Sequence, residues 1–318
     1  MTTPMQPEGK TLTVNGLSLH YLEWGKPEAP PIVCVHGYTS SAQAFNALAR
    51  HLQDRYRILA LDVRGHGESA WSPTGAYGYA DQAGDLAAFV RQLGLDKFVL
   101  IGTSMGGIIA MAYAAEHAER LSGLVINDIG PDAEAGTQRI TQMVGSRPDE
   151  FATLEEAMAY RRAASPILAA RSAEDQHELA LGVLRQGAGG KWGWKMVPAY
   201  IRQRVERGPP VRPLLWPALE ALPCPTLVVW GSDSDVLSEG AGAPHGRRAT
   251  ARRIGARARH RTRADPRRTG RAGGPRPLSR RLAEPITPPY CDPSFCARSI
   301  TLAATARPSA APATMSLR

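Results

Sequence analysis

A serine between two glycines marks the point where one apolar run gives way to another. Residues 98–101 read Phe-Val-Leu-Ile, residues 102–106 read Gly-Thr-Ser-Met-Gly, and the apolar, alanine-rich stretch 107–115 follows. This pattern predicts a buried strand that turns sharply into a helix at Ser104. The turn needs small residues two before and two after the serine, because larger side chains would collide with neighbouring strands.

A serine at such a turn is placed for chemistry. The turn lifts the Ser104 side chain clear of the sheet and sets it at the N-terminus of the following helix. The amide of Met105 can then point at a developing oxyanion, and the helix dipole adds partial positive charge there. An isolated Gly-x-Ser-x-Gly also occurs in ordinary turns, so the interpretation depends on its surroundings.

Two more strand-and-loop segments precede this serine. Residues 31–35 are apolar and lead into His-Gly-Tyr-Thr, while residues 58–62 lead into Val-Arg-Gly-His-Gly-Glu-Ser. Together with the Ser104 turn, they resemble the His-Gly loop, the D-x-R-G-H-G-x-S segment and the nucleophile elbow of the α/β-hydrolase superfamily. The resemblance covers residues from about 10 to about 238. It implies an α/β-hydrolase fold with a mostly parallel sheet, helices on both faces and a helical lid.

The resemblance also divides the chain into parts. Residues 1–131 are expected to form the first part of the core, residues 132–213 the helical lid, and residues 214–238 a further core strand with the loop of a catalytic acid. Residues 239–318 form a basic tail rich in arginine, alanine and proline, predicted to be disordered or out of frame.

A catalytic triad in the chain order serine, carboxylate, histidine is implied by the resemblance. Ser104 is the expected nucleophile, and Asp235, in the loop after the apolar run 226–230, is the expected carboxylate. Asp233 in the same loop is an alternative. Asp128, at the end of another apolar run, is a second alternative, although a loop aspartate more often only turns the chain.

The backbone N–H groups of Tyr38 and Met105 are the implied oxyanion hole. His36 and His66 are implied to be structural, with His36 shaping the oxyanion loop, and neither is assigned a proton transfer. Arg64 is expected either to anchor this loop by hydrogen bonds or to face solvent.

The composition changes abruptly near residue 239. Residues 239–318 contain 17 arginines, no lysine and four acidic residues, a net charge of +13, whereas residues 1–238 carry 21 basic and 25 acidic residues, a net charge of −4. The tail has neither the strand period nor the helical period of apolar residues. The last strand, the Gly-His loop and the closing helix that the resemblance requires are therefore predicted to be lost.

A shift of reading frame accounts for this break. Within residues 255–269, codons read one base out of frame permit a Gly-His pair followed by Asp-Glu-Pro, which resembles the family's last loop. We therefore expect a one-base insertion or deletion near codons 239–245 and the loss of the catalytic histidine. Only His245 and His260 follow Asp235, and His260 lies among arginines, which argues against its acting as a base.

Composition limits the other classes of function. The four cysteines show no metal-type spacing with histidine, so the sequence predicts no zinc site, disulfide framework or cofactor. No run of about twenty apolar residues is present, and the opening residues do not form a signal peptide. We expect a cytoplasmic protein that makes no membrane contact, and its oligomeric state stays open.

The expected function is hydrolysis of a small carboxylic ester, enol-lactone or related acyl compound through an acyl-enzyme, impaired here by the missing histidine. A carbon–carbon bond hydrolase of the ring-cleavage type is the nearest alternative, because it shares the elbow and the triad. A catalytically inactive fold with a binding tail is the alternative from another class. Nucleic acid is disfavoured as its partner, because Tyr290 and Phe295 are the only aromatic residues of the tail.

Overall fold

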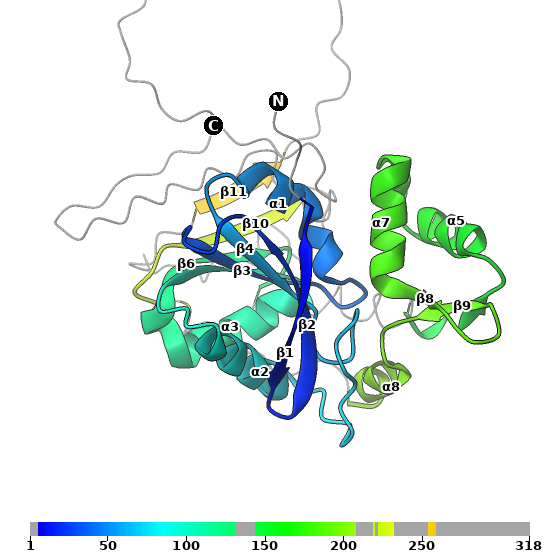
Figure 1. Ribbon diagram of the computed structural model, residues 1–318, viewed down its shortest axis with the longest axis horizontal. Helices are drawn as coiled ribbons and strands as arrows, with labels where there is room; N and C mark the ends of the chain where they lie inside the picture. The colour runs from blue at the N-terminus through cyan, green and yellow to red at the C-terminus, as the bar shows by residue number, and fades with distance from the viewer. Residues whose placement is uncertain (1–5, 131–143, 208–218, 220–221, 232–253, 259–318) are drawn as a thin grey trace, which may run out of the picture.

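An eight-stranded sheet forms the centre of the molecule (Figure 1). The computed structural model describes residues 6–130, 144–207, 219, 222–231 and 254–258. The strands lie in the order β1-β2-β4-β3-β5-β6-β10-β11, antiparallel from β1 to β4 and parallel from β4 onward. They are β1 (Glu8–Val14), β2 (Leu17–Trp24), β3 (Pro31–Val35), β4 (Arg57–Leu61), β5 (Phe98–Thr103), β6 (Leu121–Asn127), β10 (Thr226–Gly231) and β11 (Ile254–Ala258). This mostly parallel sheet confirms the predicted fold class.

The two faces of the sheet carry separate hydrophobic cores. Val33 and Val35 of β3 pack into one core, and the alternate residues Ile32 and Cys34 pack into the other. Helices on both faces cover these cores, as predicted (Figure 1). The first core is covered by α2 (Tyr79–Gln92) and α3 (Met105–His117), and the second by η1 (Ala42–Phe45) and α1 (Asn46–Leu52), while η2 (Ala118–Arg120) continues from α3.

The described part of the predicted lid combines helices with a small sheet. Its strands pair in the order β7-β9-β8 around a core of their own, which includes Phe151 and Ala157. Side-chain caps begin two of the helices, because Thr153 accepts a hydrogen bond from the backbone of Glu156 and Ser172 one from Asp175. The elements are β7 (Glu150–Phe151), α5 (Leu154–Ala164), α6 (Pro166–Ala169), α7 (Ala173–Val183), β8 (Leu184–Gln186), β9 (Trp192–Trp194) and α8 (Pro198–Arg207).

Ion pairs attach this lid to the core at two places. On one side, Arg50 of α1 pairs with Asp175 and Glu178 of α7, and the amide of Asn46 donates to Glu178 over 2.7 Å. On the other side, Lys195 pairs with Glu68 of the core. The lid is therefore joined to the core through α7 and through the residue that follows β9.

One prediction about the sheet is wrong. The sequence pattern indicated that no strand follows β10, but Ile254–Ala258 forms β11, parallel to β10, with Ile254 opposite Leu227 and Ala258 opposite Gly231. Parallel pairing uses backbone N–H and C=O groups, so a strand can form without the apolar alternation that usually signals one. The predicted Gly-His loop and closing helix lie outside the described residues.

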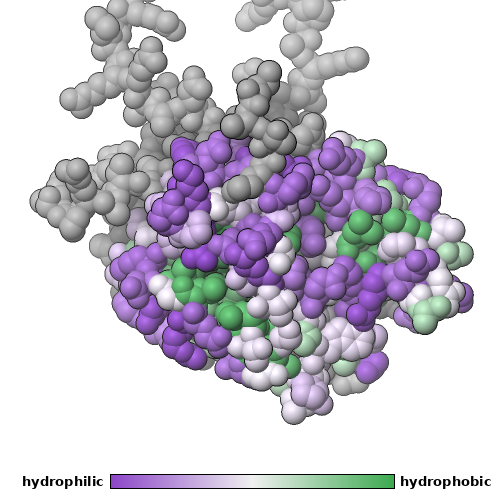
Figure 2. All heavy atoms as spheres, in the orientation of Figure 1, coloured by the Kyte–Doolittle hydropathy of each residue, from purple (hydrophilic) through white to green (hydrophobic). Residues whose placement is uncertain are grey.

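Hydrophilic residues cover much of the visible face, and hydrophobic residues show both left of centre, over the core, and in the lid on the right of the view (Figure 2). Within the part of the chain that the structure describes, no helix combines the length and the apolar character needed to span a bilayer.

Candidate active site

Ser104 sits in a strained turn between β5 and α3. Its backbone has φ 49° and ψ −114°, a conformation that non-glycine residues rarely adopt. Its N–H donates to the carbonyl of Asn127 over 2.9 Å, and its carbonyl accepts from the N–H of Gly107 over 2.8 Å. Its side chain does not cap α3. The predicted strand-turn-helix at this serine is confirmed. The hydroxyl of Ser104 makes no hydrogen bond that caps the N-terminus of α3.

Two glycines make this turn possible. A side-chain carbon on Gly102 would overlap the carbonyl oxygen of Gly106, and one on Gly106 would overlap the carbonyl oxygen of Val35. Because these neighbours are backbone atoms, they cannot move aside as a flexible side chain could. The spacing of the glycines in the sequence thus follows from the close approach of α3 to β3 and β5.

The loop after β3 packs beside this serine. A side-chain carbon on Gly37 would lie 3.6 Å from Cβ of Ser104, so the loop that contains Gly37 and Tyr38 borders the turn. Met105, on the other side of Ser104, is the first residue of α3, whose positive dipole end lies here. The structure therefore places the loop of Gly37 and Tyr38 beside Ser104 and the first residue of α3.

Two buried histidines hold this loop. Nε2 of His36 accepts from the N–H of Val63 over 3.2 Å, so Nδ1 carries the proton and donates to the carbonyl of Gly37 over 2.7 Å. His66 places Nε2 2.7 Å from the carbonyl of Tyr38. Burial lowers the pKa of His36, and burial together with the neighbouring His36 lowers the pKa of His66 to about 3. Both rings are thus neutral at physiological pH, and both bind backbone atoms of the loop.

A buried carboxylate supports the same region. Asp62 accepts from the N–H of Ala42 over 2.7 Å, from the N–H of Glu68 over 3.1 Å and from Nδ1 of His20 over 2.8 Å. Burial would raise the pKa of Asp62, but the hydrogen bond from His20 and the attraction of His36 outweigh burial and lower it. Asp62 is the first residue of the D-x-R-G-H-G-x-S segment, and its role depends on contacts that the motif does not reveal.

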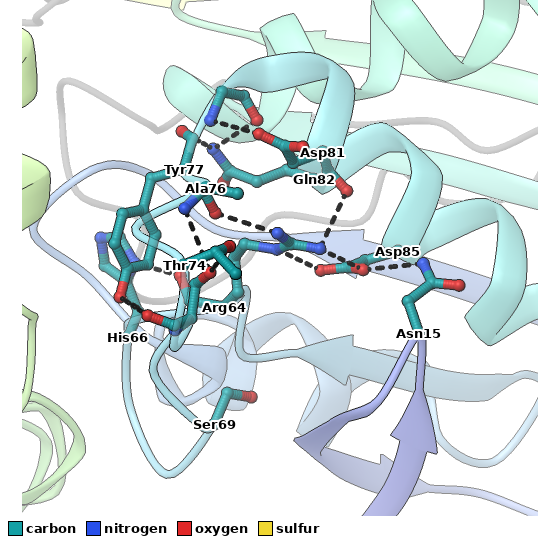
Figure 3. A network of polar contacts seen from close by, with 12 residues as sticks. Asn15, Arg64, His66, Ser69, Thr74, Ala76, Tyr77, Asp81, Gln82 and Asp85 are labelled. Atoms are coloured by element: carbon teal, nitrogen blue, oxygen red, sulfur yellow. Dashed lines mark hydrogen bonds and ion pairs between the residues drawn. The ribbon is translucent and has the colours of Figure 1, made fainter.

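Arg64 is buried rather than facing solvent, and it anchors the segment between β4 and α2 (Figure 3). Its Nε and Nη2 atoms donate to the two carboxylate oxygens of Asp85, each over 2.6 Å, and Nη1 donates to the carbonyl of Ala76 over 2.9 Å. Asn15 donates to the same carboxylate over 2.9 Å. This bidentate pair ties the segment after β4 to α2.

The acid and the base of the expected triad are not placed. Asp235 and Asp233, like His245 and His260, lie outside the described residues. Asp128 is described: it is buried at the end of β6 with φ 52°, and its N–H donates to the carbonyl of Val229 over 2.7 Å. The described residues hold no group of three histidine, cysteine or acidic side chains suited to a metal ion.

The lid contributes a residue that the sequence did not reveal. The hydroxyl of Tyr200 in α8 accepts from the amide of Gln82 over 2.8 Å and lies 3.2 Å from the sulfur of Met105. Its ring centre is 5.1 Å from that of Tyr38. Tyr200 thus contacts the side chains of both expected oxyanion residues. No local motif surrounds it, because the contact joins segments far apart in the chain.

The chain is similar to a family of known enzymes. Residues 30–251 match the model of the alpha/beta hydrolase fold family. The 3-hydroxybutyrate-oligomer hydrolase of Cupriavidus necator is 33% identical over 227 residues, which cover 68% of this chain and 77% of that protein. The N-formylmaleamate deformylase of Pseudomonas putida is 36% identical over 141 residues, 43% of this chain and 52% of that protein.

Solved structures agree with this similarity. E-2-(acetamidomethylene)succinate hydrolase has a TM-score of 0.66 and 26% identity, covering 74% of this chain and 85% of its own. An alpha/beta hydrolase of Novosphingobium aromaticivorans has a TM-score of 0.65 and 30% identity, with the same coverage. The sheet order, the strained serine turn and these matches lead to one assignment. The chain belongs to the α/β-hydrolase fold family of enzymes.

Proposed function

We propose that Ser104 is the nucleophile of a serine hydrolase that acts on a small carboxylic ester, enol-lactone or related acyl compound. The observation that carries this proposal is the strained conformation of Ser104. Its side chain makes no capping hydrogen bond to α3 and lies beside the loop of Gly37 and Tyr38. Strain of this kind persists only where the surrounding structure enforces it, and it is concentrated at functional sites. The relatives named above, an oligomer hydrolase and a deformylase, support chemistry at an acyl carbon.

In the proposed reaction of an intact triad, the hydroxyl oxygen of Ser104 attacks the acyl carbon while a histidine base takes the hydroxyl proton. The bond from the acyl carbon to the leaving group then breaks, the histidine returns the proton to the leaving group, and water cleaves the resulting acyl-enzyme in the same way. The N–H groups of Tyr38 and Met105 stabilise the negative charge that develops on the acyl oxygen. Asp235 is the proposed carboxylate that would orient a histidine base. His36 and His66 take no part in proton transfer, because both are buried and bound to backbone atoms.

We further propose that this chain lacks that histidine base because its reading frame shifts near codon 239. The composition supports this: a nearly neutral hydrolase sequence is followed by a tail with 17 arginines and no lysine. Without the base, only the rate supplied by binding and by the oxyanion hole remains.

Covalent labelling tests the nucleophile. We expect a fluorophosphonate to add to the peptide that contains Ser104, slowly in this chain, and peptide mass mapping would locate the adduct. Ser104→Ala should abolish it, whereas Ser122→Ala, an exposed serine of β6, should leave it unchanged. An adduct on another residue, or one that persists in Ser104→Ala, would refute the proposal.

A further inference from the structure

A tyrosine of the lid contacts both residues whose N–H groups are proposed to stabilise the oxyanion. The hydroxyl of Tyr200 donates to the sulfur of Met105 over 3.2 Å, and the hydroxyl of Tyr38 donates to the carbonyl of Tyr200 over 3.4 Å. The ring centres of Tyr38 and Tyr200 are 5.1 Å apart, and all three residues are buried. These contacts tie α8 to the loop beside Ser104 and to the first residue of α3.

The neighbours of the Tyr200 hydroxyl fix the direction of its proton. Nε2 of Gln82 in α2 lies 2.8 Å from this hydroxyl, 3.1 Å from the carbonyl oxygen of Tyr77 and 3.4 Å from that of Gly78. Two nearby carbonyl oxygens favour a donor at this position, so the Gln82 nitrogen donates and the Tyr200 hydroxyl accepts. The hydroxyl proton is then directed to the Met105 sulfur. Because a thioether is a weak acceptor, this contact contributes position more than stability.

The loop that contains Tyr38 is also held from the core. Nε2 of His66 lies 2.7 Å from the carbonyl oxygen of Tyr38. The ring of His66 packs edge-on against the ring of Tyr200, with centres 5.1 Å apart and planes at 80°. Tyr200 therefore packs against the same histidine that binds the backbone of Tyr38. A displacement of Tyr200 would reach the Tyr38 backbone through the Tyr38 side chain and through His66.

The start of α8 is attached to the core beside this cluster. The N–H of Val197 donates to the carbonyl of Gly65 over 2.9 Å, and Nε1 of Trp71 donates to the carbonyl of Lys195 over 3.2 Å. A side-chain carbon on Gly65 would lie 2.8 Å from Cγ1 of Val197, so the two segments are in close contact. Tyr200 follows three residues later, and its N–H donates to the carbonyl of Val197 over 3.1 Å. The attachment of the lid to the core thus defines where Tyr200 lies.

We propose that Tyr200 is a positioning residue that holds the oxyanion hole through its hydrogen bond to Met105 and its packing on Tyr38. An oxyanion hole is effective only when its donors are in place before the charge develops. The N–H of Met105 is one of the first in α3 and has no intrahelical partner, and a methionine side chain alone is flexible. The contact with Tyr200 restricts this freedom. The inference rests on the proposed function of Ser104 and gives the lid a part in the reaction.

The rate of fluorophosphonate labelling tests this role in the full chain. As the Ser104 oxygen bonds to phosphorus and fluoride leaves, negative charge grows on the phosphonyl oxygen, which the hole should stabilise. Tyr200→Phe removes the hydroxyl and keeps the ring. We expect the labelling rate at saturating probe to fall about tenfold, as for the loss of one hydrogen bond. The probe concentration at half-saturation should stay the same, whereas a general disturbance of the pocket would change it.

Two further variants separate the hydrogen bond from the rest of the cluster. Met105→Leu removes the acceptor with little change in volume, and it should show the same fall as Tyr200→Phe. The double variant should show no further fall, because both substitutions remove one interaction. Tyr77→Phe is the matched control, because its ring centre lies 5.6 Å from that of Tyr200 but its hydroxyl binds the backbone of Ser72. It should be labelled at the parent rate.

Labelling of Tyr200→Phe at the parent rate, or a change confined to its half-saturation concentration, would overturn the inference. An equal fall in Tyr77→Phe, or independent effects of the Tyr200 and Met105 substitutions, would also overturn it. If Tyr200→Phe does not fold, Met105→Leu decides, and the parent rate in that variant would contradict the proposed role. Equal labelling of Ser104 in all variants would leave the proposed function intact, whereas a parent chain without a Ser104 adduct would overturn both.

Discussion

At the scale of single residues, the candidate site depends on a strained backbone at Ser104 and on a glycine at position 106, where a larger residue has no space. Ser104 is held at φ 49° because its N–H and its carbonyl are both hydrogen-bonded, and such strain typically costs on the order of 1–3 kcal/mol. The close approach of Gly106 to Val35 leaves no room for relaxation. The rest of the fold must therefore compensate for this local cost.

Gly106→Ala should destabilise the protein strongly. The added methyl group would overlap the carbonyl of Val35, and we expect a loss of about 3 kcal/mol in the free energy of unfolding, as for other overpacked sites. The matched control is Gly84→Ala in α2, where nothing lies within 4 Å of the new carbon. That change should stabilise the protein by roughly 0.5–1 kcal/mol. Urea unfolding of both variants measures the difference, and equal stability would contradict the packing described for the turn.

His66 makes stability depend on pH. Its pKa is lowered to about 3 in the folded protein, chiefly by burial, so between pH 3 and the ordinary value of 6.5 the unfolded chain binds a proton that the folded chain does not. Stability should therefore fall as the pH falls through this window. For one such histidine, the loss from pH 7 to pH 5 is about 2 kcal/mol.

Thermal unfolding at pH 7 and pH 5 checks this expectation. The fall in melting temperature should be smaller in His66→Asn than in the parent chain, whereas His51→Asn, at an exposed position of α1, should not reduce it. His36, whose pKa is also lowered, acts in the same direction and remains in both variants. Asp62 does not interfere, because its lowered pKa matters only below its ordinary value of 3.8. If the melting temperature falls as much in His66→Asn as in the parent chain, the neutral, buried state of this ring is contradicted.

Local motifs predicted the residues of the serine turn well but not the residues that reach it from elsewhere. Ser104, Met105 and Tyr38 follow directly from a strand, a loop and a glycine spacing, which are properties of short segments. Tyr200 comes from the lid, and its contacts with Met105 and Tyr38 depend on how distant segments pack. A single sequence carries no pattern for such contacts.

At the scale of elements, several polar contacts between described residues join the lid to the core, and two of them connect α1 to α7. Arg50 of α1 makes two ion pairs with α7, and its side chain is 33% exposed, so solvent weakens these pairs. The contacts are better suited to fixing the position of α7 than to contributing much stability.

Arg50→Ala should loosen α7 while leaving the core intact. We expect amide hydrogen exchange to increase in Ala173–Val183 but not in the central strands, with a loss of no more than about 1 kcal/mol in global stability. Arg91→Ala, at an exposed position of α2, is the control and should change neither region. Unchanged exchange in α7 would mean that its other contacts with the core hold this helix without Arg50.

The end of the sheet shows the limit of prediction from side-chain patterns. β11 pairs with β10 although its sequence, Ile-Gly-Ala-Arg-Ala, lacks the apolar run typical of a buried parallel strand. The pattern correctly indicated an abrupt change of composition, but it could not exclude pairing that depends on the backbone.

At the scale of the whole molecule, the chain joins two parts of opposite charge. Residues 1–238 carry a net charge of −4 and residues 239–318 one of +13. Under the proposed frame shift, this difference in charge arises from a changed reading of the gene and has no role in the function of the enzyme. An independent DNA read across the codons for residues 235–269 should reveal one missing or additional base, and confirmation of the present frame would contradict that prediction.

Ester turnover by the frame-restored chain tests whether Ser104 acts with a histidine that the present chain lacks. With 4-nitrophenyl acetate, the restored chain should hydrolyse the ester at least about a thousandfold faster than the present chain, because a triad without its histidine keeps only residual activity. Ser104→Ala in the restored chain should reduce its rate to that residual level. Equal rates for the restored and present chains would contradict the loss of the base. Turnover that survives Ser104→Ala would contradict Ser104 as the nucleophile.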